Sequence, residues 1–250
     1  MQTSVLLHNN GPALWPEHKP LSEVLDLQAT TPESIWETTY QGNPSPPAGS
    51  VFKRSWWLRD TRYDVTEPGS QIQTVARYIS WDTALKDKDT SDYSAAVIGE
   101  LWPDYRLAIR YVLRERLPFP DLPTEIEALA KQYDYDDKLR AIIIEDKASG
   151  TSAYQTLLAG SDNHISSLLI PFMPTADKVT RANQAGVWCR NGCVQLPLAN
   201  EAAPWLFDFE DEIFNFPSAA HDDQVDAFSQ LVIYLEHLLA DGWRARNGIA

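Results

Sequence analysis

Residues 141–146 read AIIIED, a nearly continuous apolar run that stops at two acids. Such a run is typical of a strand that is buried on both faces of a sheet. The segment TSAYQTLLAG at 151–160 predicts a helix that ends at its glycine. Together they predict an α/β protein in which a central strand leads into a helix, with carboxylates at the end of the strand.

Three further strands are predicted before this run. They are TVARYISWDTA (74–84), YSAAVIGELW (93–102) and RLAIRYVLRERL (106–117). The polar loop KDKDTSD between the first two indicates an antiparallel meander. A helix over 122–135 and a fifth strand over 166–174 complete the order βββαβαβ. That order predicts a mixed five-stranded sheet flanked by helices, the layout of the ribonuclease H-like fold.

The remaining segments are expected to surround this sheet. They are a helix over 177–188, a hairpin over 188–197 with its turn at Asn191-Gly192, an amphipathic helix over 203–217 and a long helix over 221–240. Residues 1–72 are rich in Pro, Trp and short polar turns. We expect them to form an N-terminal arm that packs on a main domain over 73–250.

The composition argues against several classes of protein. The net charge is −14, which counts against a protein that holds DNA by charge alone, although not against a nuclease whose acids bind metal. The sequence contains no run of 18 or more apolar residues, so no membrane span is predicted. The N-terminus lacks a signal-peptide pattern, so an intracellular protein is expected. The two cysteines, Cys189 and Cys193, are too few for a structural zinc site.

Acids stand at three places where a buried sheet would not favour them. They are Asp82 at the end of the first strand, Glu145 and Asp146 at the end of the run 141–146, and Asp222, Asp223 and Asp226 at the start of the last helix. Each alone also fits a solvated turn, and Asp222 also fits a helix N-cap. In the predicted layout the three places converge. Clustered carboxylates are unfavourable without a cation between them, and all-oxygen ligands suit Mg²⁺ or Mn²⁺.

This pattern predicts hydrolysis of a phosphodiester with two bound metal ions. One ion would activate a water molecule and the other would stabilise the leaving oxygen, so no protein nucleophile is required. Asp92, just past the loop after the first strand, is either an accessory ligand or a solvated acid. His221 is either a proton shuttle or an ordinary residue of the helix start. Lys147, Lys178 and Arg181 are the candidates for contact with DNA.

Several motifs together carry a resemblance to a known family. The acidic motifs are SWDTALK (80–86) with DTSDYSA (89–95), IIIEDKASG (142–150) and HDDQVDAF (221–228). In order and spacing they resemble the C-terminal nuclease domain of a phage terminase large subunit. Residues 14–49 resemble the connection between motor and nuclease in that family, and DKVTRA (177–182) resembles its later region.

The resemblance implies roles for individual residues. It makes Asp82 the first metal ligand and Asp226 the last, with Asp223 beside it. The middle ligand is Glu145 or Asp146, because neighbouring strand residues point to opposite faces and only one should enter the site. The resemblance favours Glu145.

The resemblance also implies partners. Double-stranded DNA would be the substrate, and the terminase ATPase motor, the small terminase subunit and the portal would be partners in the host bacterial cytoplasm. The chain contains no GxxxxGK[ST] phosphate loop, so we expect it to lack an ATPase motor of its own, as an excised domain or a prophage remnant would.

The sequence thus predicts a metal-dependent endonuclease that cuts double-stranded DNA with little sequence preference during phage genome packaging. Another ribonuclease H-like nuclease, such as a junction resolvase, is one alternative. A catalytically silent prophage domain that docks on portal or motor proteins is a second, and the acids at all three places argue against it. A structural calcium site is a third, and the absence of the EF-hand spacing argues against it.

Overall fold

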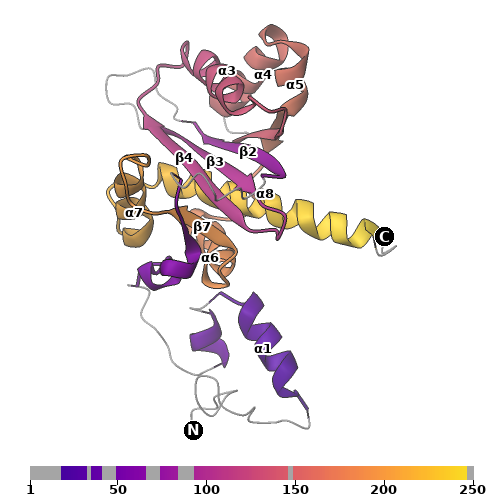
Figure 1. Cartoon of the computed structure of the whole chain (residues 1–250), viewed down its shortest axis with the longest axis vertical. Helices are drawn as coiled ribbons and strands as arrows, with labels where there is room; N and C mark the ends of the chain where they lie inside the picture. Colours follow the sequence, from indigo (N-terminus) through magenta and orange to yellow (C-terminus); the bar gives the residue numbers. More distant parts are fainter. Residues whose placement is uncertain are drawn as a thin grey trace.

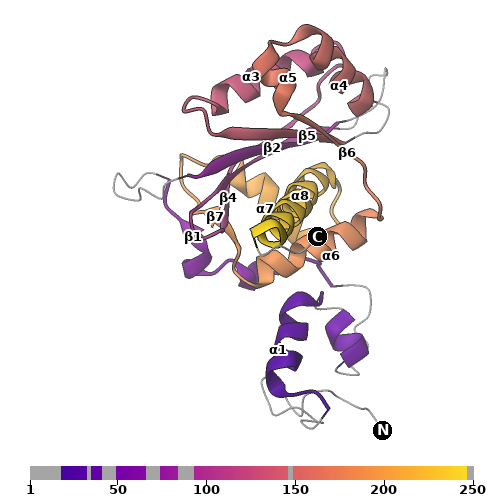
Figure 2. The same ribbon diagram turned by 90° about the vertical axis from the view of Figure 1, so that its right-hand side faces the viewer.

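The computed structural model describes residues 18–32, 35–40, 49–65, 74–83, 93–145 and 149–246. Within this part of the chain, one mixed sheet has the strand order β1-β7-β4-β3-β2-β5-β6. The strands are β1 (Arg62–Tyr63), β2 (Ala76–Asp82), β3 (Ser94–Leu101), β4 (Leu107–Glu115), β5 (Leu139–Glu145), β6 (Leu169–Phe172) and β7 (Val194–Pro197). The sheet lies between two layers of helices (Figures 1 and 2), which confirms the predicted α/β fold class.

The two helical layers cover opposite faces of the sheet. One contains α3 (Leu122–Tyr133), α4 (Ser149–Gly160) and α5 (Asn163–Leu168), and the other α6 (Lys178–Arg190), α7 (Leu206–Asn215) and α8 (Asp223–Arg246). Side chains of β5 alternate between the layers: Ile142 and Ile144 join the core under α3 and α4, while Ala141 and Ile143 join the core under α8. This double burial explains the continuous apolar run. No helix among the described residues is long and apolar enough to cross a membrane.

The strand directions place the ends of several strands at one edge of the sheet. β3 pairs antiparallel with both β2 and β4, as the predicted meander requires. β5 pairs parallel with β2, and β6 pairs parallel with β5. Consequently β2, β4 and β5 all end at the same edge.

The structure corrects the predicted hairpin over 188–197 and the predicted count of five strands. Residues up to Arg190 extend α6, whose Ala182, Ala185 and Cys189 are buried at helical spacing. After the turn, the single strand β7 pairs parallel with β4 and with the short strand β1. Gly192 has a φ of 71°, a left-handed conformation that glycine adopts at little cost. The Asn-Gly pair therefore marks a real turn, but a helix enters it.

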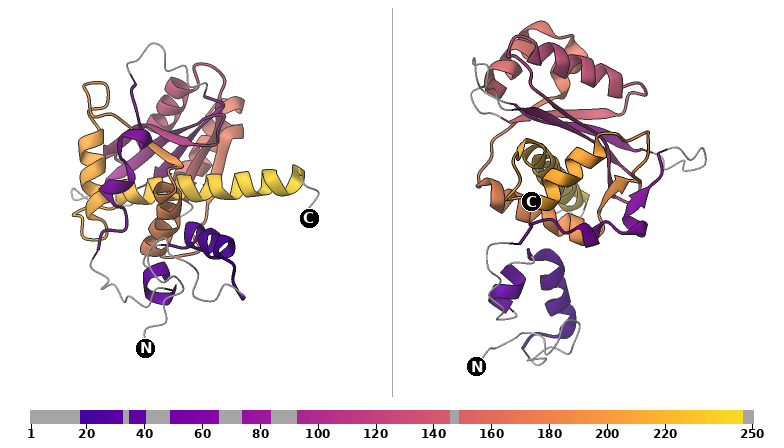
Figure 3. Two further views of the ribbon diagram at one scale, coloured as in Figure 1. Left: turned by 60° about the horizontal axis from the view of Figure 1, so that its bottom comes forward. Right: turned by 90° about the vertical axis from the view of Figure 1, so that its left-hand side faces the viewer.

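The N-terminal segment forms a small unit below the sheet domain (Figures 1 and 3). It consists of α1 (Leu21–Thr30) and a π-helical turn (Trp36–Tyr40), which pack together through Val24 and Trp36. The side chain of Asn191, just after α6, donates a 2.7 Å hydrogen bond to a carbonyl of α1.

The segment that follows belongs to the main core. It contains two short 3₁₀ turns (Arg54–Trp56 and Arg59–Thr61), and Phe52 and Trp57 are buried against α8 and its neighbours. The predicted boundary between residues 72 and 73 lies outside the described residues.

Gly99 of β3 faces α8, where an added side chain would collide with the core. A Cβ there would lie 2.6 Å from Leu107 Cδ1 and 2.9 Å from Leu231 Cδ2, both in buried side chains. We expect Gly99→Val to lower the free energy of unfolding by about 1–3 kcal/mol in urea titrations, because α8 must shift to accept the added volume. Gly160→Ala is the control, since its methyl group meets no atom within 4 Å. Equal effects of the two variants would contradict the close packing of α8 on β3.

Candidate active site

Two carboxylates leave the sheet side by side at the edge where β2 and β5 end. The parallel register pairs Trp81 with Ile144, so Asp82 and Glu145, the next residues, end the two strands at the same level. Because side chains alternate along a strand, both acids project to the face of Ile143, which α8 covers. Glu145 is buried and Asp82 is half-buried. This arrangement places the predicted first and middle acids together.

The first turn of α8 brings two more carboxylates to them. Asp223 and Asp226 lie three residues apart on one helix face. Burial raises the pKa of Asp82 well above its usual range, and the negative charges of Asp226 and Glu145 raise it further. Burial and the charge of Glu212 raise the pKa of Asp223 to about 6. The acids of β2, β5 and α8 therefore form one cluster, in which each charge affects its neighbours.

Two cations of α6 offset part of this charge. Lys178 Nζ lies 2.7 Å from Asp226 Oδ2 and 2.8 Å from Asp222 Oδ1. Arg181 Nη2 lies 2.5 Å from Asp226 Oδ1, and its Nη1 donates a 3.0 Å hydrogen bond to the carbonyl of Ala176. Arg181 is buried, whereas Lys178 is half-exposed on a flexible stem. Arg181 therefore fixes the Asp226 carboxylate, and Lys178 is the partner that an incoming cation can displace.

A buried glutamate of α7 caps the start of α8. Glu212 Oε1 accepts hydrogen bonds from the backbone N–H groups of Gln224, at 2.7 Å, and Val225, at 3.0 Å. Its Oε2 accepts a 3.1 Å bond from Arg114. Glu212 thus satisfies amide groups that the first turn of a helix leaves unpaired, and its charge is favourable at a helix N-terminus. These bonds fix the turn that carries the two α8 acids.

A buried glutamine joins the same helix to the strands. The side-chain amide of Gln230 donates a 3.0 Å hydrogen bond to Ser80 Oγ and lies 3.3 and 3.4 Å from the carbonyl oxygens of Trp81 and Ile143. Gln230 follows Asp226 by four residues, so both lie on the same face of α8. The contact therefore sets the separation between the acids of α8 and those of the strands.

The donor set fits a hard divalent cation by its chemistry. Asp82, Glu145 and Asp226 offer only carboxylate oxygens, the ligands that Mg²⁺ and Mn²⁺ prefer. Burial and the negative charges of Asp226 and Glu145 raise the pKa of Asp82, and a bound cation would favour the ionised acids. Within the described part of the chain, no three acidic, histidine or cysteine side chains are already close enough to enclose an ion. The carboxylates would have to close around one.

The other predicted site residues have different surroundings. Asp92, Asp146 and Lys147 lie outside the described residues. His221 is exposed, and its ring meets that of Tyr93 edge-on, with 5.0 Å between the ring centres. Sequence reasoning missed the roles of Glu212 and Gln230, although each shows one usable signal: a polar residue on the buried face of a helix.

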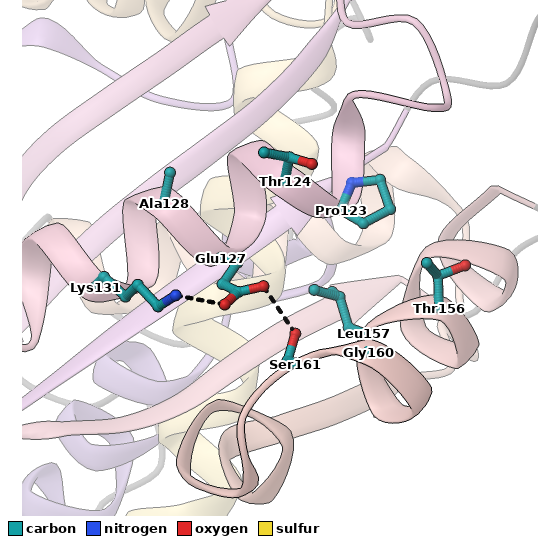
Figure 4. Close-up of a pocket in the computed structure, with 9 residues that line it drawn as sticks. All are labelled: Pro123, Thr124, Glu127, Ala128, Lys131, Thr156, Leu157, Gly160 and Ser161. Atoms are coloured by element: carbon teal, nitrogen blue, oxygen red, sulfur yellow. Dashed lines mark hydrogen bonds and ion pairs between the residues drawn. The ribbon is translucent and has the colours of Figure 1, made fainter.

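A groove of about 460 Å³ lies in the opposite helical layer, between α3 and α4 (Figure 4). Within it, Lys131 and Ser161 both contact the carboxylate of Glu127, at 2.5 and 3.2 Å. The sheet separates this groove from the acid cluster, so the groove is not part of the candidate site.

The raised pKa values indicate how stability depends on pH when no metal is bound. A carboxyl group with a higher pKa in the folded than in the unfolded chain binds protons preferentially in the folded state. In EDTA we therefore expect the free energy of unfolding to fall as the pH rises from about 4 through the folded pKa values of Asp223 and Asp82. Urea titrations at several pH values measure this fall.

The variant Asp82→Asn distinguishes the contribution of the cluster to this pH dependence from that of the other acids of the chain. It removes the charge of one cluster member, and the fall in stability with pH should become shallower. Asp60→Asn, at an exposed carboxylate, is the matched control and should leave the pH dependence of the wild type unchanged. The same pH dependence in both variants would contradict the assignment.

Gln230→Leu tests whether the glutamine positions the acids. The change preserves size but leaves Ser80 without its partner, so we expect the free energy of unfolding to fall by about 1–3 kcal/mol. We also expect weaker Mn²⁺ binding in calorimetry. The control is Gln184→Leu, which removes a 2.7 Å bond to Glu236 that lies away from the acids. Wild-type Mn²⁺ affinity in Gln230→Leu would show that this residue stabilises the core without positioning the ligands.

Two solved structures share the fold. The large terminase of a thermophilic bacteriophage matches with a TM-score of 0.60 and 10% identity, over 86% of this chain and 54% of that protein. The large terminase nuclease of the thermophilic phage G20c, solved with bound cobalt, matches with a TM-score of 0.52 and 16% identity, over 75% of this chain and 98% of that one. This chain thus spans about half the length of the first of these proteins.

A comparison of the sequence with family models identifies the family. No curated protein sequence matches the chain. A family model described as the terminase RNaseH-like domain matches residues 79–235, more than half of the chain, from within β2 to within α8. The matched stretch includes Asp82, Glu145, Asp223 and Asp226. The resemblance to the nuclease domain of a terminase large subunit is confirmed, and the chain belongs to the terminase RNaseH-like domain family.

Proposed function

We propose that this chain is a metal-dependent endonuclease that cuts double-stranded DNA with little sequence preference during phage genome packaging. The convergence of carboxylates from β2, β5 and α8 on one edge of the sheet carries the proposal. Membership of the terminase family supports it, and so does the fold shared with a terminase nuclease that was solved with bound cobalt.

In this proposal Asp82, Glu145 and Asp226 hold two Mg²⁺ or Mn²⁺ ions, and Asp223 assists them. Bound ions would activate a water molecule for attack on phosphorus and stabilise the leaving oxygen. Glu145 is preferred to Asp146 as the middle ligand because it ends β5 on the face that α8 covers.

Other residues of the chain hold these ligands in place. Arg181 binds one oxygen of Asp226, and Gln230 ties α8 to β2. Lys178 pairs with the other oxygen of Asp226, and a metal that displaced it would free its ammonium group to contact a phosphate. The accessory candidates remain Asp92, Asp222 and His221. The proposed DNA contacts are Lys147 and Lys178. Arg181 is buried against Asp226, so we propose that it positions this ligand instead of contacting DNA.

The proposed setting is a packaging machine in the host bacterial cytoplasm. An ATPase motor would deliver DNA to the nuclease, and a small terminase subunit and a portal would complete the assembly. The family relationship supports these partners.

Cleavage of supercoiled plasmid DNA in Mg²⁺, Mn²⁺ or EDTA tests the proposal. We expect nicking and linearisation only with a divalent metal. Asp82→Asn and Asp226→Asn should lower the rate by more than about 100-fold, because even residues that merely support a metal ligand contribute about 10–100-fold. The exposed control Asp60→Asn should cut like the wild type.

Other outcomes would favour different functions. Plasmid that stays intact with every metal, together with no Mn²⁺ binding in calorimetry, would contradict the proposal. Cleavage in EDTA would contradict the metal dependence. Preferred cleavage of a four-way junction over a linear duplex would favour a junction resolvase.

A further inference from the structure

A cationic site lies at the same edge of the sheet as the acid cluster. One row of paired residues, Asp82, Ala95 and Arg114, runs straight across β2, β3 and β4. With neighbouring strands about 4.8 Å apart, the Cα of Arg114 lies roughly 10 Å from that of Asp82. The bond between Arg114 and Glu212 of α7 shows that the Arg114 side chain projects to the face that carries the acids.

The centre of this cationic site is an aromatic ring. Arg116 Cζ lies 4.5 Å from the centre of the Tyr93 ring, and Arg114 Cζ lies 5.0 Å from it. His221, which immediately precedes the acids of α8, meets the same ring edge-on. Stacking on a ring restrains a planar guanidinium group and leaves the N–H donors at its edge available to oxygen atoms. The site therefore presents prearranged donors.

The two arginines differ in how far their charge is already offset. Arg114 lies 3.1 Å from Glu212 and 3.8 Å from Asp208, so carboxylates of α7 already balance it. Arg116 is exposed, and the structure shows it on Tyr93 with no carboxylate partner among the described residues. In a chain with a net charge of −14, a guanidinium group left unbalanced beside an acid cluster points to an anionic ligand.

We propose that Arg116, stacked on Tyr93 and flanked by Arg114 and His221, binds a backbone phosphate of the DNA that the acid cluster cuts. This inference rests on the proposed function. Because Arg116 follows the end of β4, at the edge of the sheet where Asp82 and Glu145 end β2 and β5, the bound phosphate lies close to the scissile one. A guanidinium group can donate two parallel N–H bonds to a phosphate. Such a contact grips the backbone without reading bases, as cutting with little sequence preference requires.

Fluorescence anisotropy of a labelled DNA duplex, in EDTA and over a range of NaCl concentrations, tests this contact. Arg116→Gln should weaken binding about tenfold, the loss of one charge-assisted contact, and should lower the salt dependence by about one counterion. Arg116→Lys keeps the charge without the planar stack and should recover part of the affinity. Arg106→Gln is the matched control, because Arg106 also stacks on a ring, 5.1 Å from that of Trp102, but lies at the opposite end of β4.

Plasmid cleavage and Mn²⁺ calorimetry on the same variants separate this inference from the proposed function. The inference stands if Arg116→Gln alone weakens DNA binding while it binds Mn²⁺ and unfolds in urea like the wild type, whether or not the wild type cuts plasmid. It fails if Arg116→Gln and Arg106→Gln weaken binding equally, or if neither does. It also fails if the wild type binds no duplex at the lowest salt, even when plasmid cleavage succeeds.

Discussion

The structure depends on one unfavourable contact: carboxylates of β2, β5 and α8 are brought together in a partly buried place. The register of two parallel strands puts Asp82 beside Glu145, and the position of α8 sets Asp226 against both. Burial raises the pKa of Asp82, and the negative charges of Asp226 and Glu145 raise it further. The same repulsion that lowers the stability of the metal-free fold provides affinity for a divalent cation, because a cation removes it.

The restraints that oppose this repulsion lie around the cluster. Glu212 fixes the first turn of α8, Gln230 joins the helix to β2, and Arg181 holds Asp226 from α6. The close packing of α8 over Gly99 of β3 also holds the helix in place and so supports these three contacts. The site is therefore held by rigid elements rather than by loops, and its supporting residues serve the fold and the ligands together.

The sequence predicted those features of the site that depend on neighbouring residues in the chain. Asp82 and Glu145 were predictable because each ends a predicted strand, and Asp226 because it lies near the start of a long predicted helix. The short strands β1 and β7 were not, since their pairing is non-local and a two-residue strand leaves almost no pattern. The sequence also could not supply the pairs that hold the site, because Gln230 and Ser80 lie 150 residues apart. The proposed preference for Glu145 over Asp146 rests on which face of β5 is covered by α8, and a local pattern does not contain that information.

Diffraction from crystals grown with Mn²⁺ shows whether the acid cluster binds metal, because the anomalous signal of manganese locates the ions without reference to activity. We expect strong peaks coordinated by Asp82, Glu145 and Asp226, with Lys178 displaced from Asp226, and no peaks in Asp82→Asn crystals. Crystals in which the acid cluster holds no manganese, while Lys178 still pairs with Asp226, would contradict metal binding by these carboxylates.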